Sequence, residues 1–241
     1  MNETVDVLAI GTHPDDVELC CGGTVARLAA AGRRVGLLHL TRGEGGTRGS
    51  AEERLREAER AAEILGAAQL DFLDCGDGAL RTGPAEEDAL IAVLRRRRPE
   101  VVLAPPPRDR HPDHGRASAL VEAASFYAGL EARGEGSPHR PGAVFFYMQH
   151  HLFEPRFIVD VSATWHQRSE ALAAYGSQFY RPDASDGEAT TKIATRQFAL
   201  AVEGRARHFG EIVGAEFGEP FGSRQPLAVG DLMGLIPGGV R

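Results

Sequence analysis

The chain has 241 residues, with 34 acidic and 27 basic side chains and a formal net charge of −7. This length predicts one domain whose core needs neither a disulfide nor a metal to fold. A content of 42% hydrophobic and 25% charged residues excludes general disorder, collagen and coiled coil. The acidic balance argues against a nucleic-acid partner. We therefore expect residues 1–241 to form a single globular domain.

Cysteine usage and the N-terminal residues bear on the compartment. The three cysteines, Cys20, Cys21 and Cys75, are odd in number and two are adjacent, so we expect free thiols in a reducing cytoplasm. The first residues are acidic and lack a basic segment, which argues against a secretory signal. No run approaches about 18 apolar residues, so we expect neither a membrane span nor a membrane partner.

Apolar runs alternate with helical patterns along the first half of the chain. The expected strands and helices, in chain order, are residues 5–10 (strand), 24–31 (helix), 35–40 (strand), 51–65 (helix), 70–73 (strand), 86–98 (helix), 101–104 (strand) and 114–128 (helix). Ser50 and Glu53 have capping-box spacing, and Gly66 ends the helix that they begin.

This alternation predicts βαβ units and an α/β fold of the Rossmann-like, doubly wound class, with a mostly parallel sheet and helices on both faces. In the common strand order 3-2-1-4-5, strands 1 and 4 are neighbours. The crevice at their carboxyl ends is the usual ligand site.

The second half is less regular. We expect strands at residues 144–148 and 157–161 and helices at residues 164–176 and 195–209, with a surface loop over residues 129–142. Residues 219–241 are rich in Gly and Pro, and we expect this tail to be loosely ordered or packed on a partner subunit.

Two short motifs follow the first and fourth expected strands. The sequence HPDD occupies residues 13–16, and HPDH occupies residues 111–114. A single His-Pro-Asp is usually only a turn, but two of them after neighbouring parallel strands would face one crevice. Together they supply three imidazoles and three carboxylates.

These side chains suit a catalytic zinc site, which has three nitrogen or oxygen ligands and one water. His13, Asp16 and His114 would make such a ligand set. Asp15, His111 and Asp113 are then left for acid–base work. We expect Asp15 to be the general base, and His111 to act at the reacting centre with Asp113 orienting its ring.

The sequence resembles the LmbE-like (PIG-L) family of zinc N-deacetylases. The likeness rests on GTHPDDVE at residues 11–18 and on HPDHG at residues 111–115. It extends through GGT, TRGE and GTRG in the first fifty residues, and through FIVDV and YGSQF at residues 157–161 and 175–179. These later segments and the length look most like the bacillithiol-pathway branch, which deacetylates N-acetylglucosaminyl-malate.

The resemblance implies one zinc ion per chain, held by His13, Asp16 and His114. It implies Asp15 as the base, and His111 with Asp113 behind it at the oxyanion and leaving amine. It also implies a small N-acetylated amino-sugar substrate and a homo-oligomer such as the hexamer that relatives in this branch form. Arg54 and Arg110 match basic substrate-binding positions, and we add Arg42 and Arg48 from the loop before the second helix as further candidates for carboxylate contacts.

Several alternatives stay open. Many relatives of this branch carry a tyrosine where this chain has Phe198, so either Tyr175 or Tyr180 replaces its hydroxyl or that contact is dispensable. Residues 183–191 also differ from the expected pattern, which weakens the assignment of a malate conjugate. An inositol conjugate, a chitin fragment, an antibiotic sugar or a thiol-conjugate amide are other substrates, and a non-catalytic metal- or sugar-binding protein is the rival class. His150 or His151 is a further candidate for lining the crevice.

Overall fold

The computed structural model describes residues 3–181, 191–230 and 232. Within them, seven strands form one sheet in the order β3-β2-β1-β4-β5-β7-β6. The strands are β1 (Val7–Gly11), β2 (Val35–His39), β3 (Gln69–Phe72), β4 (Val101–Ala104), β5 (Ala143–Tyr147), β6 (Phe157–Asp160) and β7 (Gly218–Gly222). Strands β1 to β5 are parallel, whereas β7 runs antiparallel to both its neighbours. The expected order 3-2-1-4-5 is therefore confirmed.

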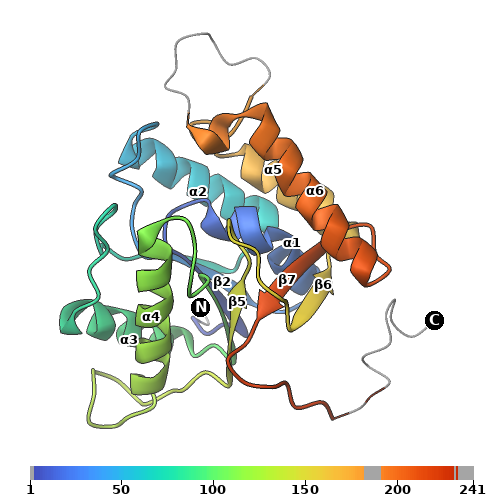
Figure 1. Ribbon diagram of the computed structural model, residues 1–241. Coiled ribbons are helices and arrows are strands. Elements are labelled where there is room, and N and C mark those ends of the chain that lie inside the picture. The colour runs from blue at the N-terminus through green and yellow to red at the C-terminus, as the bar shows by residue number, and fades with distance from the viewer. Residues whose placement is uncertain (1–2, 182–190, 231, 233–241) are drawn as a thin grey trace.

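Helices cover both faces of this sheet, as expected (Figure 1). The α-helices of the described residues are α1 (Asp16–Ala30), α2 (Ala51–Leu65), α3 (Pro84–Arg97), α4 (Pro112–Tyr127), α5 (Trp165–Ala173) and α6 (Arg196–Ile212). Short 3-10 helices precede α5 (Ser162–Thr164) and α6 (Lys192–Ala194). None of the helices described is long and apolar enough to cross a membrane.

The two faces of the central strands bury their side chains in two separate cores. Val7 and Ala9 pack with α1 and α2, whereas Leu8 and Ile10 pack with α3 and α4. Because both faces are covered, β1 is a continuous apolar run without polar alternation. This explains why its sequence predicted a buried parallel strand.

The start and end of α2 are also confirmed. The Ser50 hydroxyl accepts the backbone N–H of Glu53 at 3.1 Å. Gly66 follows the helix with φ of 74°, a left-handed conformation that glycine adopts without a Cβ clash.

The start of α1 corrects the expectation of a helix over residues 24–31. The helix begins at Asp16 and kinks at Cys21, where φ is −145°. Beyond the kink, the Glu219 carboxylate accepts the backbone N–H groups of Gly23 and Thr24 at 2.9 and 2.7 Å. A Cβ on Gly23 would lie 2.8 Å from the Val161 Cβ, so glycine is needed there for close packing. The sequence-based prediction began the helix after the glycines at residues 22–23 and so missed its first turns. In the structure, these glycines allow close tertiary contacts.

The tail expected to be loosely ordered from residue 219 is corrected in part. Residues 218–222 form β7, which lies between β5 and β6, and Glu219 is buried. From Ser223 onward the described chain leaves the sheet as a segment without helix or strand until Leu232 (Figure 1). Of the unusual residues 183–191, all except Thr191 lie outside the described residues.

Candidate metal and catalytic site

The two motifs meet at the carboxyl ends of adjacent strands. Strand β1 leads into residues 12–15 and α1, and β4 leads through residues 105–111 into α4. Their histidines converge: the ring centroids of His13 lie 4.9 Å from His111 and 5.5 Å from His114. The centroids of His111 and His114 are 5.3 Å apart. The predicted juxtaposition is present.

His13, Asp16 and His114 have the geometry and chemistry of a metal site. One ligand atom from each lies within 4.8 Å of the others. His13 Nδ1 is 3.5 Å from Asp16 Oδ2, and His114 Nε2 is 3.6 Å from Asp16 Oδ1. All three side chains are buried. Zinc bonds of about 2.0–2.2 Å to each donor are compatible with these separations. The residues therefore fit zinc, although His13, His111 and Asp113 form a second group within the same distance limit.

Asp15 has an unusual backbone and surroundings. It precedes α1 with φ of 105°, which costs a non-glycine residue about 1–3 kcal/mol and is typical of functional sites. Its carboxylate Oδ2 accepts Arg54 Nη2 at 3.2 Å. Burial raises the pKa of Asp15 above its usual range, although the Arg54 charge opposes this shift. Such a carboxylate can take up a proton near neutral pH.

His111 is held differently from the prediction. It precedes α4 as its N-cap, and Nδ1 accepts the backbone N–H of Asp113 at 3.3 Å. The Asp113 carboxylate instead accepts Leu80 N and Arg116 Nη1 through Oδ1, and its Oδ2 lies 4.0 Å from His13 Nε2. The ring is therefore oriented by the Asp113 backbone, because the cap geometry brings that N–H to the ring. Burial, with His13 and His114 nearby, lowers the pKa of His111.

The predicted arginines occupy two different environments. Arg54 is 3% exposed and donates to the carbonyls of Gly43 and Pro14 as well as to Asp15. Arg42 and Arg110 are exposed, in the loops after β2 and β4. Arg54 thus ties the first motif to the Gly-rich loop, and contacts from these arginines to a substrate remain predictions.

Three polar residues of the site were not predicted. Asp109 Oδ2 lies 2.6 Å from His114 Nδ1, and Asp77 Oδ1 lies 3.1 Å from His13 Nε2. Gln149 donates from Nε2 to Asp16 Oδ1 and lies 3.4 Å from His114 Nε2. Asp109 was within reach of sequence reasoning, since it precedes the second motif in the same loop. Asp77 and Gln149 follow other strands and carry no motif.

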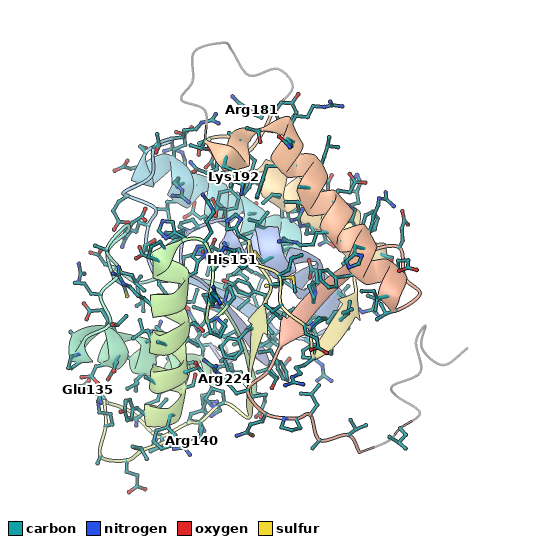
Figure 2. The ribbon with its side chains drawn as sticks, in the orientation of Figure 1. Glu135, Arg140, His151, Arg181, Lys192 and Arg224 are labelled. Atoms are coloured by element: carbon teal, nitrogen blue, oxygen red, sulfur yellow. The ribbon has the colours of Figure 1, made fainter. Side chains whose placement is uncertain are left out.

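Other candidates are also placed by the structure. The ring of His150 stacks on that of His114, with centroids 6.2 Å apart. The ring centroid of Phe198 lies 5.8 Å from that of His150. Figure 2 labels His151 near the middle of the view, between α4 and α1. The Tyr175 hydroxyl is buried and donates to Glu18, whereas Tyr180 is exposed.

A cavity of about 810 Å³ opens beside this centre. Its lining includes His150, His151, Arg108 and Arg156. His150 therefore lies between His114, one of the candidate metal ligands, and a space large enough for a small organic molecule.

Comparison with known proteins agrees with this geometry. The profile of the PIG-L family, described as GlcNAc-PI de-N-acetylase, matches residues 8–125. The chain is 36% identical over 195 residues to the diacetylchitobiose deacetylase of Thermococcus kodakarensis, covering 74% of this chain and 72% of that protein. The chain belongs to the PIG-L family.

Two further relatives show the breadth of the similarity. The solved structure of the conserved protein TT1542 from Thermus thermophilus superposes with a TM-score of 0.86 and 40% identity, covering 95% of this chain and 99% of that one. The 4-oxalmesaconate hydratase of Pseudomonas putida is 28% identical over 189 residues, covering 71% of this chain and 73% of that protein. The fold that this chain shares with TT1542 therefore extends over nearly its full length.

Proposed function

We propose that this PIG-L family member is a zinc-dependent N-deacetylase that removes acetate from an N-acetylglucosaminyl conjugate. The substrate that we propose is N-acetylglucosaminyl-malate. The observation that carries the proposal is the buried set His13, Asp16 and His114 with Asp15 and His111 beside it. The family description and the similar diacetylchitobiose deacetylase support an acetylated amino sugar as the substrate class.

The residues divide the work of amide hydrolysis. Zinc, when bound, polarises the amide carbonyl and lowers the pKa of water. Asp15 accepts the proton that the attacking water loses. His111 accepts an N–H at Nδ1, so its Nε2–H can donate a hydrogen bond to the carbonyl oxygen as negative charge develops there, and the proton taken up by Asp15 passes to the leaving amine. One such donor is typically worth about 3–4 kcal/mol in the transition state.

A malate conjugate brings two carboxylates that an enzyme of net charge −7 must attract locally. Arg42 and Arg110, exposed on the loops after β2 and β4, are suited to bidentate carboxylate contacts. Arg54 lies closer to the reacting centre, since its guanidinium contacts the proposed base Asp15.

The direct test is release of free amine from N-acetylglucosaminyl-malate by purified, zinc-loaded protein. N-acetylglucosamine and diacetylchitobiose are assayed in parallel. We expect a strong preference for the malate conjugate. Equal rates on all three would refute the malate assignment but keep the deacetylase. Absence of amine from every substrate, with zinc bound, would refute the malate assignment and point to a different acylated amine, to a binding protein, or to the reaction of the hydratase relative.

We propose that the protein works in the cytoplasm and that it forms a homo-oligomer. The three cysteines are free and buried, which fits a reducing compartment. Exposed Leu152, Leu200 and Ile212 offer apolar contacts between copies. Sedimentation velocity should give a species larger than 25.9 kDa, and a monomer would contradict the assembly.

A further inference from the structure

Each imidazole of the proposed ligand set has a carboxylate on the nitrogen that faces away from Asp16. His114 turns Nε2 toward Asp16 and Nδ1 toward Asp109, at 2.6 Å. His13 uses the opposite nitrogens: Nδ1 faces Asp16, and Nε2 lies 3.1 Å from Asp77. The side chains of Asp109 and Asp77 are 0% and 8% exposed. The two carboxylates come from different loops and have no common motif.

We propose that Asp77 and Asp109 are positioning residues that set the tautomers of the two histidine ligands and couple metal binding to two loops of the cleft. The inference rests on the proposed zinc site. A histidine coordinates through a deprotonated nitrogen, so its other nitrogen carries hydrogen. A carboxylate accepts that hydrogen, which fixes the ring orientation and strengthens the ligand.

The remaining oxygen of each carboxylate holds a loop. Asp77 Oδ2 accepts the backbone N–H of Gly45 at 2.9 Å, and Glu44 Oε1 accepts the N–H of Asp77 at 2.9 Å. These contacts fix the Gly-rich loop before α2.

Asp109 Oδ1 makes the equivalent contact on the other side. It accepts the backbone N–H groups of His150 and His151 at 2.9 and 2.8 Å. Both histidines line the 810 Å³ cavity. A change in the orientation of His114 or His13 is therefore transmitted by one carboxylate to one loop.

Zinc affinity of D77N and D109N tests the ligand role. An asparagine offers N–H where the histidine needs an acceptor, and so favours the tautomer that cannot bind metal. We expect zinc binding to weaken about 10- to 100-fold in each variant, measured by competition with a chromophoric chelator. D71N is the matched control, because Asp71, on β3, pairs with Arg97 at the end of α3 and contacts neither histidine of the proposed ligand set. Unchanged affinity in D77N and D109N would overturn the ligand role.

Hydrogen exchange with and without zinc tests the coupling, first in the unmodified protein. We expect zinc to slow exchange in residues 43–49 and 149–152 but not in the exposed loop 131–137. D77N should lose the first effect alone, and D109N the second alone. The coupling would be overturned if zinc did not slow exchange in these two loops of the unmodified protein. It would also be overturned if either variant abolished the zinc effect in both loops. If the unmodified protein binds no zinc, the proposed site itself is refuted.

Discussion

Neighbouring carboxylates in the first motif lie in different surroundings, which separates their chemistry. Burial opposes ionisation of Asp16, but His114 and His13 lie against it and lower its pKa. Asp15 is equally buried, and its pKa is raised because the charges of Arg54 and His13 do not offset the effect of burial. Opposite shifts of this kind are how enzymes separate a permanent anion from a base. Asp16 is therefore suited to ligate a metal, and Asp15 to transfer a proton.

Asp15→Asn should reduce kcat by at least about 100-fold while zinc stays bound, because the general base is lost. Asparagine tolerates the left-handed backbone at this position and can still accept from Arg54. Steady-state kinetics with metal analysis by mass spectrometry measures both effects. Loss of zinc with the activity would mean that Asp15, not Asp16, is the ligand.

Arg110→Ala should raise KM for N-acetylglucosaminyl-malate about 10-fold through loss of a charge-assisted hydrogen bond. The KM for N-acetylglucosamine, which has no carboxylate, should not change. Arg140→Ala is the control, since Arg140 contacts Phe126 far from the site, near the bottom of Figure 2. An equal change on both substrates would count against a carboxylate contact.

The residues that sequence reasoning found and those that it missed differ in one respect. The two motifs place His13, Asp16 and His114 in the loops and helix starts that follow β1 and β4, where a βαβ pattern predicts a ligand crevice. Asp77 and Gln149 lie in the loops after β3 and β5, outside the two His-Pro-Asp motifs. Their importance comes from contacts across the fold, with His13 and Asp16, which no local pattern encodes.

At the scale of elements, the parallel half of the sheet was predictable and the antiparallel edge was not. Strands β1 and β4 are apolar throughout and separated by helices, so period and length identify them. Strand β7 has the sequence GEPFG, in which glycine and proline indicate a turn. It is a strand because β5 and β6 pair with it, a tertiary effect that overrides local propensity.

Glu219→Ala should lower the free energy of unfolding by about 2 kcal/mol or more. The substitution leaves the buried N–H groups of Gly23 and Thr24, beyond the kink of α1, without their acceptor. Urea denaturation measures this change. Glu216→Ala, at an exposed position in the same segment, should stay within about 0.5 kcal/mol. Equal stability of the two variants would show that Glu219 does not hold α1.

At the scale of the whole molecule, the strand order creates the site. Because β1 and β4 are adjacent and parallel, the loops that follow them bring His13 and His111 together from residues almost a hundred positions apart. The edge formed by β5, β7 and β6 then adds the loop with Gln149 and His150. The sheet thus supplies both the candidate metal-ligand cluster and one wall of the neighbouring cavity.

The measurement that tests this account most directly is zinc titration of chelator-stripped protein, with acetate release from N-acetylglucosaminyl-malate as the signal. We predict negligible release without metal and a linear rise that ends at one zinc per chain. His114→Ala should show no such end point. Full activity in the stripped protein, or the same titration curve in His114→Ala, would contradict the proposed zinc centre.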